Sequence, residues 1–389
     1  MREGWTYKKL GEVGIIVTGT TPSTKDEANY ASPDYCFIKP SDLPSVGIAL
    51  VENSEFHIST KAFQSVRQLP IGSVLVSCIG NIGKIGILSK EACTNQQINA
   101  IIPYDMIMPK CLAYIIVSYK KDLERIANAP VVPIINKSDF AKFQIPIPPL
   151  SVQQSIVAEL DKINELIGLK KSQLSDLDSL AQSIFYEMFG DPVENEKGWE
   201  VKKLEEIVTD DCTISYGIVQ PGDGVDDGVP VVRPVDMTQT FVSRVGLKHT
   251  TVEISNSYKR TILKGKEILM CVRGTTGLVS LASSELAGCN VTRGVTPIEC
   301  NANNDRLFVY HQLQSCGIQH HISNFTKGIA LKQINMKDVR EIPLIVPPLS
   351  LQQSFAARIN AIEQQKQRIR ASIKDLETLL ASRMQYWFD

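Results

Sequence analysis

The chain has 389 residues, with 41 basic and 42 acidic side chains and 43% hydrophobic residues. This length allows two or three domains, and the composition is that of a globular protein, which excludes a disordered or fibrous chain. No apolar run reaches the roughly 18 residues of a membrane-spanning helix, and the N-terminal segment lacks the apolar stretch of a secretion signal, so we expect a cytoplasmic protein.

A segment near the N-terminus returns in the middle of the chain. Residues 4–13 (GWTYKKLGEV) match residues 198–207 (GWEVKKLEEI), and residues 72–80 (GSVLVSCIG) parallel residues 265–274 (GKEILMCVRG). The two copies diverge between such landmarks. The chain is therefore predicted to be a duplicated unit of about 195 residues, in which a variable block is followed by a nearly shared segment.

The variable block of each copy is predicted to fold as a compact α/β domain with a mixed or antiparallel sheet. Its apolar runs are short and bounded by turn residues, as in β-strands. The predicted strands are residues 74–79, 85–88, 98–102, 268–272 and 278–281, and the predicted short helices are residues 111–117 and 306–313.

Glycine-flanked turns between these strands carry polar side chains suited to nucleic-acid recognition. Arg pairs with the edge of guanine and Asn or Gln with that of adenine, whereas Lys and Thr more often hold phosphates. Ordinary hairpin turns also use Gly and Asn, so a purely structural role stays open for each residue. The candidate DNA-binding residues are Asn81, Lys84, Gln96, Gln97, Arg273, Thr275, Thr276, Thr292, Arg293 and Lys332.

Charge is unevenly distributed along the chain, although the net charge is only −1. Residues 56–142 contain ten basic and five acidic side chains, and residues 231–340 contain fourteen basic and seven acidic ones. Two basic zones are compatible with two contacts on one polyanion, and equally with ordinary solvated faces.

Residues 148–190 are predicted to form one long helix. They open with PPLSVQQS and then continue for about ten helical turns without another proline. We expect Ser151 and Gln154 to form a capping box at the start, in which each side chain satisfies one backbone donor. Gly190 is expected to end the helix in a left-handed conformation.

A second long helix with nearly the same opening is predicted over residues 347–389, with Ser350 and Gln353 as its caps. Both helices carry apolar residues at alternating spacings of four and three, which is the pattern of a coiled-coil seam. A seam needs a partner, and the simplest one is the other helix. The alternative is two tandem domains, each covered by its own helix, but such a helix usually has a broader apolar face. The seam residues are Ile156, Leu160, Ile163, Ile167, Leu174, Leu177, Ala181, Ile184 and Met188 in the first helix, and Phe355, Ile359, Ile362, Ile369, Ile373, Leu376, Leu380 and Trp387 in the second.

Three charged residues interrupt the seam: Lys170, Lys366 and Arg383. We expect the two lysines to reach solvent with their ammonium groups or to pair with acids across the helices. We expect Lys366→Leu to raise thermal stability, and a clear loss would indicate a paired charge.

Catalytic signatures are absent from the sequence. Residues 80–84 do not have the spacing of a phosphate-binding Walker loop, and residues 128–131 lack the double proline and aromatic residue of an amino-methyltransferase. There is no G-x-S-x-G or H-E-x-x-H motif. The nine cysteines form no C-x-x-C pair, so we expect reduced thiols and no zinc site. The chain is predicted to recognise a partner without catalysing a reaction.

The order of these motifs resembles the specificity subunit of type I restriction-modification systems. The resemblance covers essentially the whole chain and depends on the two Pro-Pro-Leu-Ser-x-Gln-Gln segments, the two Gly-Trp-x-x-Lys-Lys-Leu openings, and residues 18–23 and 215–222. It implies an α+β fold with two target-recognition domains, separated by two long helices that form an antiparallel coiled coil, in an internal pseudo-twofold repeat.

The resemblance also implies the division of labour along the chain. Residues 1–147 and 191–346 would each read one half of a bipartite double-stranded DNA site, and residues 148–190 and 347–389 would be spacers that set the distance between the halves. The helices would bind two methyltransferase subunits, which carry S-adenosylmethionine, and through them restriction subunits that use ATP and Mg. No cofactor, metal or catalytic residue is expected in this chain.

Two other functional classes stay open from the residues alone. One is a DNA methyltransferase or nuclease fused to its own recognition domains, which methyl transfer by the isolated chain would reveal. The other is a coiled-coil adaptor without a DNA role, which the absence of salt-dependent DNA binding would favour.

Overall fold

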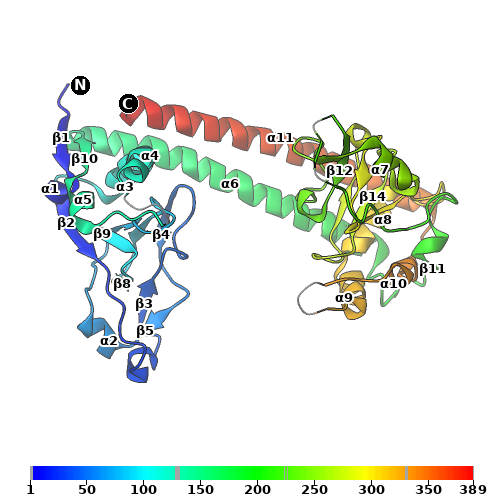
Figure 1. Cartoon of the computed structure of the whole chain (residues 1–389), viewed down its shortest axis with the longest axis horizontal. Coiled ribbons are helices and arrows are strands. Elements are labelled where there is room, and N and C mark those ends of the chain that lie inside the picture. Colours follow the sequence, from blue (N-terminus) through cyan, green and yellow to red (C-terminus); the bar gives the residue numbers. More distant parts are fainter. Residues whose placement is uncertain (1–2, 128–131, 223, 226, 329–331, 389) are drawn as a thin grey trace. The chain divides into compact units, whose positions relative to one another are not determined.

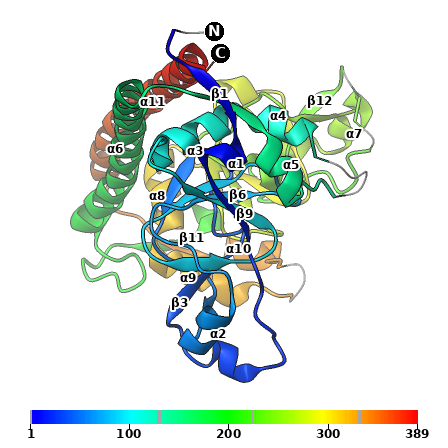
Figure 2. The ribbon, with the colours of Figure 1, turned by 90° about the vertical axis from the view of Figure 1, so that its left-hand side faces the viewer.

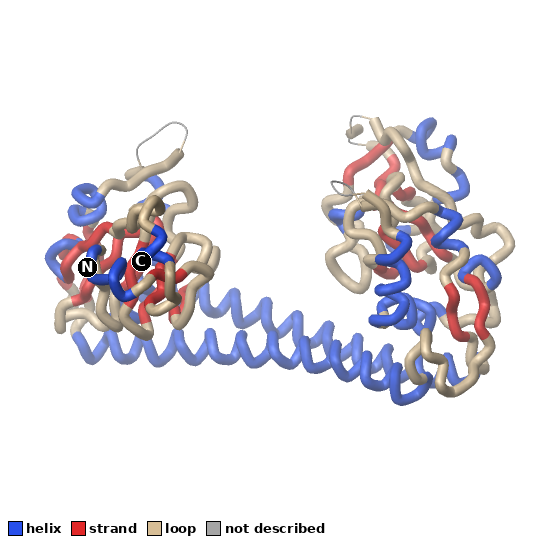
Figure 3. Tube along the Cα trace, turned by 90° about the horizontal axis from the view of Figure 1, so that it is seen from below, coloured by secondary structure: helices blue, strands red, loops and turns tan. Residues whose placement is uncertain are grey.

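The computed structural model describes residues 3–127, 132–222, 224–225, 227–328 and 332–388. The chain divides into two compact units: unit 1 is Met1–Lys170 with Ser372–Asp389, and unit 2 is Lys171–Ala371. Each unit contains part of both long helices, α6 (Leu150–Phe189) and α11 (Leu349–Phe388). Both helices are continuous along the Cα trace (Figure 3).

Unit 1 is built around a five-stranded mixed sheet with the strand order β2-β9-β6-β7-β4. Only β4 and β7 pair in parallel, and the other neighbours are antiparallel. A smaller sheet has the order β5-β3-β8. The strands of unit 1 are β1 (Thr6–Lys9), β2 (Gly14–Thr18), β3 (Tyr35–Ile38), β4 (Ile48–Val51), β5 (His57–Ile58), β6 (Val74–Ser77), β7 (Ile85–Leu88), β8 (Ala92–Thr94), β9 (Ile98–Pro103) and β10 (Gln144–Ile147).

The short helices of unit 1 cover this sheet and connect its strands. In Figure 2, α3 lies beside the sheet that contains β6 and β9. Its six consecutive residues Cys111–Ile116 are all buried, so the helix is covered on every side and belongs to the core. These helices are α1 (Leu10–Val13), α2 (Thr60–Ser65), α3 (Pro109–Ser118), α4 (Lys120–Arg125) and α5 (Lys137–Lys142), with a 3-10 turn η1 (Glu27–Tyr30).

Unit 2 has two three-stranded sheets, with the orders β15-β14-β17 and β13-β12-β16. The strands are β11 (Val201–Lys203), β12 (Val229–Val232), β13 (Lys248–Thr250), β14 (Ile268–Cys271), β15 (Val279–Leu281), β16 (Asn290–Val291), β17 (Val295–Ile298) and β18 (Pro343–Ile345). The short helices are α7 (Val252–Ser257), α8 (Arg306–Gln314), α9 (Cys316–Phe325) and α10 (Met336–Arg340), with 3-10 turns η2 (Leu204–Glu206), η3 (Pro234–Asp236), η4 (Lys259–Thr261) and η5 (Ser284–Leu286). The predicted strands and the two predicted short helices are confirmed.

The repeated openings of the two copies have one structural role. In unit 1, β1 pairs antiparallel with β10, the strand that leads into α6, and Figure 1 shows the two strands side by side. In unit 2, β11 pairs in the same way with β18, which leads into α11. The start and end of each variable block are therefore joined directly before the long helix begins.

The predicted capping boxes are wrong. The helices already begin at Leu150 and Leu349, so Ser151 and Ser350 lie inside the first turn and not at the cap. The hydrogen bonds at the helix start come instead from the first glutamine of each Gln-Gln pair, and not from Gln154 or Gln353, which are exposed.

The fully buried Gln153 and Gln352 fasten the helix starts to the preceding domains. The Gln153 amide donates to the carbonyls of Met106 and Pro148, each at 2.9 Å, and its oxygen accepts from the Met108 N–H at 2.8 Å. Gln352 donates to the Pro347 carbonyl and accepts from the Asp305 N–H, both at 2.8 Å. A buried amide that satisfies two backbone segments in this way is costly to replace, because its loss leaves unpaired polar groups.

The far end of α6 follows the prediction. Gly190 has a φ of +75°, and its N–H donates to the Tyr186 carbonyl at 2.9 Å, so the helix closes in the left-handed conformation.

In unit 1, the beginning of α6 and the end of α11 contribute to one hydrophobic core. Ile156 and Leu160 of α6 are fully buried in the same cluster as Phe388 of α11. The guanidinium of Arg383 and the indole N–H of Trp387 both donate to the carboxylate of Glu159 on α6, the latter at 2.8 Å. The last turns of α11 therefore pack against the first turns of α6.

In unit 2, the opposite ends of the same helices meet. Phe185 and Phe189 of α6 lie in one aromatic cluster with Phe308 and with Phe355 of α11, at ring-centroid distances of 4.6–6.5 Å. Full burial of one such side chain contributes on the order of 1.5–3 kcal/mol. Since the end of α6 contacts the start of α11 here, the two helices run antiparallel.

The seam residues differ in burial along the helices. Ile156, Leu160, Ile163, Ile167, Ala181, Phe355, Ile359, Ile362 and Ile373 are buried, and Leu174, Leu177, Ile184, Met188, Ile369, Leu376, Leu380 and Trp387 are half-buried. Phe185 and Phe189 lie one residue after the predicted seam positions Ile184 and Met188 and are more deeply buried. At this end the helix has a second apolar face, which packs against the domain as well as against α11.

Candidate nucleic-acid interface

In unit 1, the predicted DNA-binding residues lie at one edge of the five-stranded sheet. Strand β6 ends and β9 begins at this edge, where Ser77 pairs with Ile98. Strand β2 ends there too, where Thr18 pairs with Asn99. The turn after β6, the turn before β9 and the segment after β2 therefore leave the sheet side by side, and they contain all four candidates of the first copy.

Backbone hydrogen bonds hold these turns together. The Cys78 N–H donates to the Gln97 carbonyl at 2.8 Å, and the Gly80 N–H donates to the Pro133 carbonyl at 2.9 Å. Ile79 also forms an isolated antiparallel bridge with Ile134. Three loops that are distant in sequence are thus joined by backbone hydrogen bonds into one surface.

The four candidates of the first copy differ in their exposure and in whether their polar groups already have a hydrogen-bond partner within the protein. Asn81, Gln96 and Gln97 are exposed. The Gln97 oxygen accepts from the Asn95 amide at 2.8 Å. Lys84 is half-buried, and its ammonium donates to the Pro40 carbonyl at 2.9 Å, so it already has an internal partner.

In unit 2, the turns of the second copy are joined by the same backbone hydrogen bonds as those of unit 1. The Val272 N–H donates to the Gly294 carbonyl and the Gly274 N–H donates to the Lys332 carbonyl, each at 2.8 Å. Arg273 forms an isolated antiparallel bridge with Gln333. These bonds match those of unit 1 one for one, so the structural repeat includes these loops, although their sequences differ.

The candidates of the second copy are likewise gathered at this edge. Thr275 and Lys332 are exposed, whereas Arg273, Thr276 and Thr292 are half-buried. The Thr292 hydroxyl donates to the Val232 carbonyl at 3.3 Å, and the Thr276 hydroxyl lies 3.1 Å from that of Thr326. Arg273 has its Nε buried without a hydrogen-bond partner.

A hollow lies beside the glycine turn in each unit. The hollow in unit 1 measures about 410 Å³, and that in unit 2 about 490 Å³. The first is lined by Ser45, Gly80, Asn81, Ile82, Lys84, Lys120, Glu124 and Pro133, and the second by Gly274, Thr275, Thr276, Gln319, Ser323, Thr326, Gly328 and Lys332.

The second glycine of each turn packs closely against a residue that lines the hollow. Gly83 and Gly277 have φ values of +76° and +87°, which a side chain would strain. A Cβ at Gly83 would also lie 2.8 Å from the Lys120 side chain, and one at Gly277 would lie 2.7 Å from that of Gln319. Gln319 donates to the Gly277 carbonyl at 2.9 Å. The same turn therefore packs on the same helical region in both copies.

Sequence reasoning did not predict the structural role of residues 18–23 and 215–222. A Cβ at Gly19 would lie 2.1 Å from the Asn95 carbonyl oxygen, and one at Gly217 would lie 2.2 Å from that of Val291. Only glycine allows these strands to approach so closely, and the approach brings each segment against the turn with the candidate base readers. A glycine inside a repeated motif was the signal that could have indicated this.

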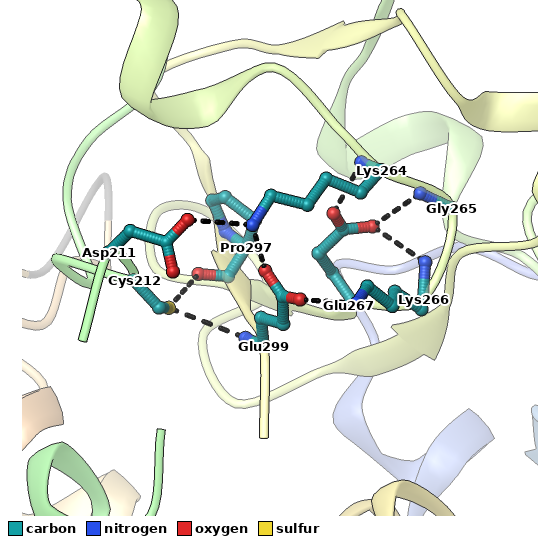
Figure 4. Close-up of polar contacts among 8 residues, drawn as sticks. All are labelled: Asp211, Cys212, Lys264, Gly265, Lys266, Glu267, Pro297 and Glu299. Atoms are coloured by element: carbon teal, nitrogen blue, oxygen red, sulfur yellow. Dashed lines mark hydrogen bonds and ion pairs between the residues drawn. The ribbon is translucent and has the colours of Figure 1, made fainter. Parts of the chain in front are cut away.

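Part of the positive charge of the second block is neutralised away from this edge (Figure 4). The Lys264 ammonium lies 2.8 Å from Asp211 and 2.7 Å from Glu299, and Lys266 lies 2.9 Å from Glu299. Asp211 and Glu299 raise the pKa of Lys264. Burial alone would raise the pKa of Glu299, but the two ammonium groups lower it overall. The local excess of basic residues thus overstates the unpaired positive charge of this block.

The described part of the chain contains no group of three or more His, Cys, Asp or Glu residues placed to hold a metal ion. Burial raises the pKa of the Cys78, Cys93 and Cys111 thiols to about 12, so these cysteines stay protonated near neutral pH. Residues 128–131, which lack the methyltransferase motif, lie outside the described residues. Among the described helices, none is both long and apolar enough to cross a membrane.

The two matching edges and the paired helices are features of a duplicated DNA-recognition protein. The family model described as the type I restriction modification DNA specificity domain matches residues 2–178 and again residues 196–378. The chain therefore belongs to this family and contains two copies of its domain.

Named relatives and solved structures agree with this family. The MjaIX specificity subunit of Methanocaldococcus jannaschii is 26% identical over 92% of this chain and 86% of its own length. The EcoR124I/EcoR124II specificity subunit of Escherichia coli is 31% identical over 41% of each chain.

The fold is shared with a type I specificity subunit from M. genitalium, at a TM-score of 0.55 and 14% identity over 99% of this chain and 96% of that one. A chain from a structure that describes the assembly and conformational transition of the type I system has a TM-score of 0.59 and 18% identity over 99% and 97%.

These comparisons confirm the predicted α+β fold with two recognition domains and the assignment to type I specificity subunits. Such subunits recognise DNA and are not catalytic. Nothing in the comparisons supports a fused enzyme or a coiled-coil adaptor.

Proposed function

We propose that this chain recognises a bipartite sequence in double-stranded DNA and that each of the two edges reads one half. The main support is that both copies build the same edge from the same backbone hydrogen bonds while carrying different polar side chains there. A constant frame with variable side chains is what recognition of two different half-sites requires.

We propose that the segments divide this work as the sequence suggested. Residues 1–147 and 191–346 are the two recognition domains, and residues 148–190 and 347–389 are the spacers. Helices α6 and α11 have 40 residues each, which corresponds to about 60 Å at 1.5 Å per residue. An antiparallel pair of this length is suited to separating half-sites by about one turn of DNA, roughly 34 Å, when each domain reaches inward.

The helix pair also offers surface for partner subunits. Leu169 and Leu180 of α6 and Leu379 of α11 are 54%, 46% and 45% exposed, although leucine is usually buried. We propose that two methyltransferase subunits bind the helices and supply S-adenosylmethionine, and that restriction subunits using ATP and Mg associate through them. The complex would act in the cytoplasm, where the chromosome is accessible.

Mapping of methylated adenines tests this function directly. Host DNA is sequenced for N6-methyladenine with the gene present and with it deleted. We expect one bipartite motif, with a methylated adenine in each half, to disappear on deletion. Retention of every methylated motif would contradict the proposal.

Replacing one recognition domain tests the modular division. We expect that exchange of residues 1–147 for the corresponding block of another family member changes one half of the motif and leaves the other half and the spacer intact. A change in both halves would show that the two copies do not read DNA independently.

A further inference from the structure

At this edge of unit 1, backbone hydrogen bonds of the residues before and after Gln96 fix its position. Gln96 lies between Thr94, whose carbonyl accepts from the Thr20 N–H at 2.8 Å, and Gln97, whose carbonyl accepts from the Cys78 N–H at 2.8 Å. The turn is thereby fixed to the segment after β2 and to the turn after β6. Gln96 itself is exposed.

The same two bonds identify its counterpart in unit 2. Arg293 lies between Val291, whose carbonyl accepts from the Ile218 N–H at 2.8 Å, and Gly294, whose carbonyl accepts from the Val272 N–H at 2.8 Å. The arginine therefore occupies in the second copy the place that the glutamine occupies in the first.

In unit 1, a neighbouring hydroxyl orients the glutamine. The Thr21 hydroxyl donates to Oε1 of Gln96 at 2.5 Å. This contact leaves both N–H groups of the amide and the second lone pair of Oε1 for a ligand. An amide that offers one donor and one acceptor side by side matches the N6 and N7 positions of adenine in the major groove.

In unit 2, a neighbouring ring supports the arginine. The Arg293 guanidinium lies 5.7 Å from the centre of the Tyr216 ring, a cation–π arrangement. The Tyr216 hydroxyl is itself held by the Ile334 carbonyl at 3.5 Å and the Gln333 amide at 3.4 Å. No carboxylate forms an ion pair with Arg293 among the residues that the structure describes. Its fork of donors matches O6 and N7 of guanine.

We propose that Gln96 and Arg293 are equivalent base-reading residues, with Gln96 reading an adenine in one half-site and Arg293 a guanine in the other. Thr21 and Tyr216 are positioning residues, which hold the reader in its bonding orientation. This inference rests on the proposed function, because it assumes that each edge faces one half-site. It also gives the motifs at residues 18–23 and 215–222 a role in recognition.

The test uses the complete methyltransferase complex and a DNA library in which each position of both half-sites is varied. Methylation of each variant site is counted by sequencing. For Gln96→Ala we expect a loss of about 5- to 140-fold in discrimination at one adenine of one half-site, the range for a single bidentate contact. Arg293→Ala should cause a loss of the same order at one guanine of the other half-site.

Substitutions that exchange the two readers make the test sharper. Gln96→Arg should shift the preference at its position from adenine toward guanine, and Arg293→Gln should do the opposite. Lys90→Ala is the control, because this exposed residue follows β7 at the opposite end of the strands. It should leave the motif unchanged.

The positioning residues need a different readout. Thr21→Val should reduce discrimination at the Gln96 position only, and Thr21→Ser should restore it, while the melting temperature of the complex stays the same. A general loss of folding would instead reduce methylation at every site equally.

The possible outcomes separate this inference from the proposed function. If the wild-type complex methylates a bipartite motif but Gln96→Ala and Arg293→Ala leave every position of it unchanged, the inference is wrong and the function stands. If the wild-type complex shows no bipartite motif at all, the proposed function fails first.

Discussion

Lys366 provides a sharp test of the packing between the long helices. Its side chain is only 5% exposed, and its ammonium lies 2.7 Å from Asp178 on α6 and 2.5 Å from Glu363 on its own helix. Asp178 is 63% exposed and can be solvated again, but Glu363 is 13% exposed and cannot. Replacement of Lys366 by methionine therefore leaves a nearly buried carboxylate without its cation.

The expected cost follows from these exposures. Removal of one partner of a buried ion pair costs roughly 3–5 kcal/mol, and a pair with an exposed partner contributes about 0–1 kcal/mol. We expect Lys366→Met to destabilise unit 2 by about 2–4 kcal/mol, or roughly 5–15 °C in the melting temperature of a unit of this size. The structure thus reverses the expectation that an apolar residue here would raise stability, because the charge is paired.

Calorimetry of the purified chain at neutral pH measures this effect. Arg368→Met is the matched control, because it removes an exposed cation two residues along the same helix and should change the melting temperature little. The double variant Lys366→Met with Glu363→Met should recover most of the loss, since no buried charge then stays unpaired. An unchanged melting temperature in Lys366→Met, or no recovery in the double variant, would refute the reasoning.

Four further predictions test other parts of the structure. Burial, and then the charge of Lys366, lower the pKa of His311 from 6.5 to about 4. The folded state therefore holds this imidazole neutral, and as the pH falls from 6.5 toward 4 the unfolded state gains a proton that the folded state does not. Up to about 3 kcal/mol of stability is lost over this range. His311→Gln should flatten the melting temperature between these pH values, and an unchanged pH profile would assign the loss to other groups. Glu159→Gln should weaken the contact with Arg383 and Trp387 by only about 1 kcal/mol in a denaturation assay, because both charged side chains are 31% exposed. Glu267→Gln should cost about 1.5–3 kcal/mol, since this carboxylate, 3% exposed, accepts three successive backbone N–H groups, and a neutral effect would show that the turn does not need the charge. Insertion or deletion of a whole heptad in either long helix should change the length of the spacer in the methylated motif, and an unchanged spacer would contradict the proposal that the helices set this distance.

The long helices show how far the sequence alone could predict the fold. The existence of both helices, the end of α6 at Gly190 and the apolar spacing depend on local rules, and the structure agrees with them. Their starts do not depend on local rules alone. Gln153, and not the predicted cap at Ser151, holds the helix because its partners lie at Met106 and Met108, which no local motif identifies.

The candidate interface shows the same limit for side chains. The type of residue and the glycine turns marked loops that the structure brings together in each unit, because the physical demands of turns are local. Whether each side chain is free to bind a ligand depends on its contacts with residues that are far away in the sequence. Lys84 is held by the carbonyl of Pro40, and Gln96 by the hydroxyl of Thr21, and neither contact follows from sequence spacing.

The division of the helices between the units bears on how the chain is made. Unit 2 is one continuous stretch, Lys171–Ala371, whereas unit 1 needs Ser372–Asp389 as well. The hydroxyl of Tyr119 bonds the carbonyl of Phe388, a residue 269 positions later, at 3.0 Å. As the ribosome works from the N-terminus, the second recognition domain has all of its residues while the first still waits for its last helical turns. The segment synthesised first is therefore the last to complete its core, because Phe388 joins the cluster of Ile156 and Leu160 only when synthesis ends.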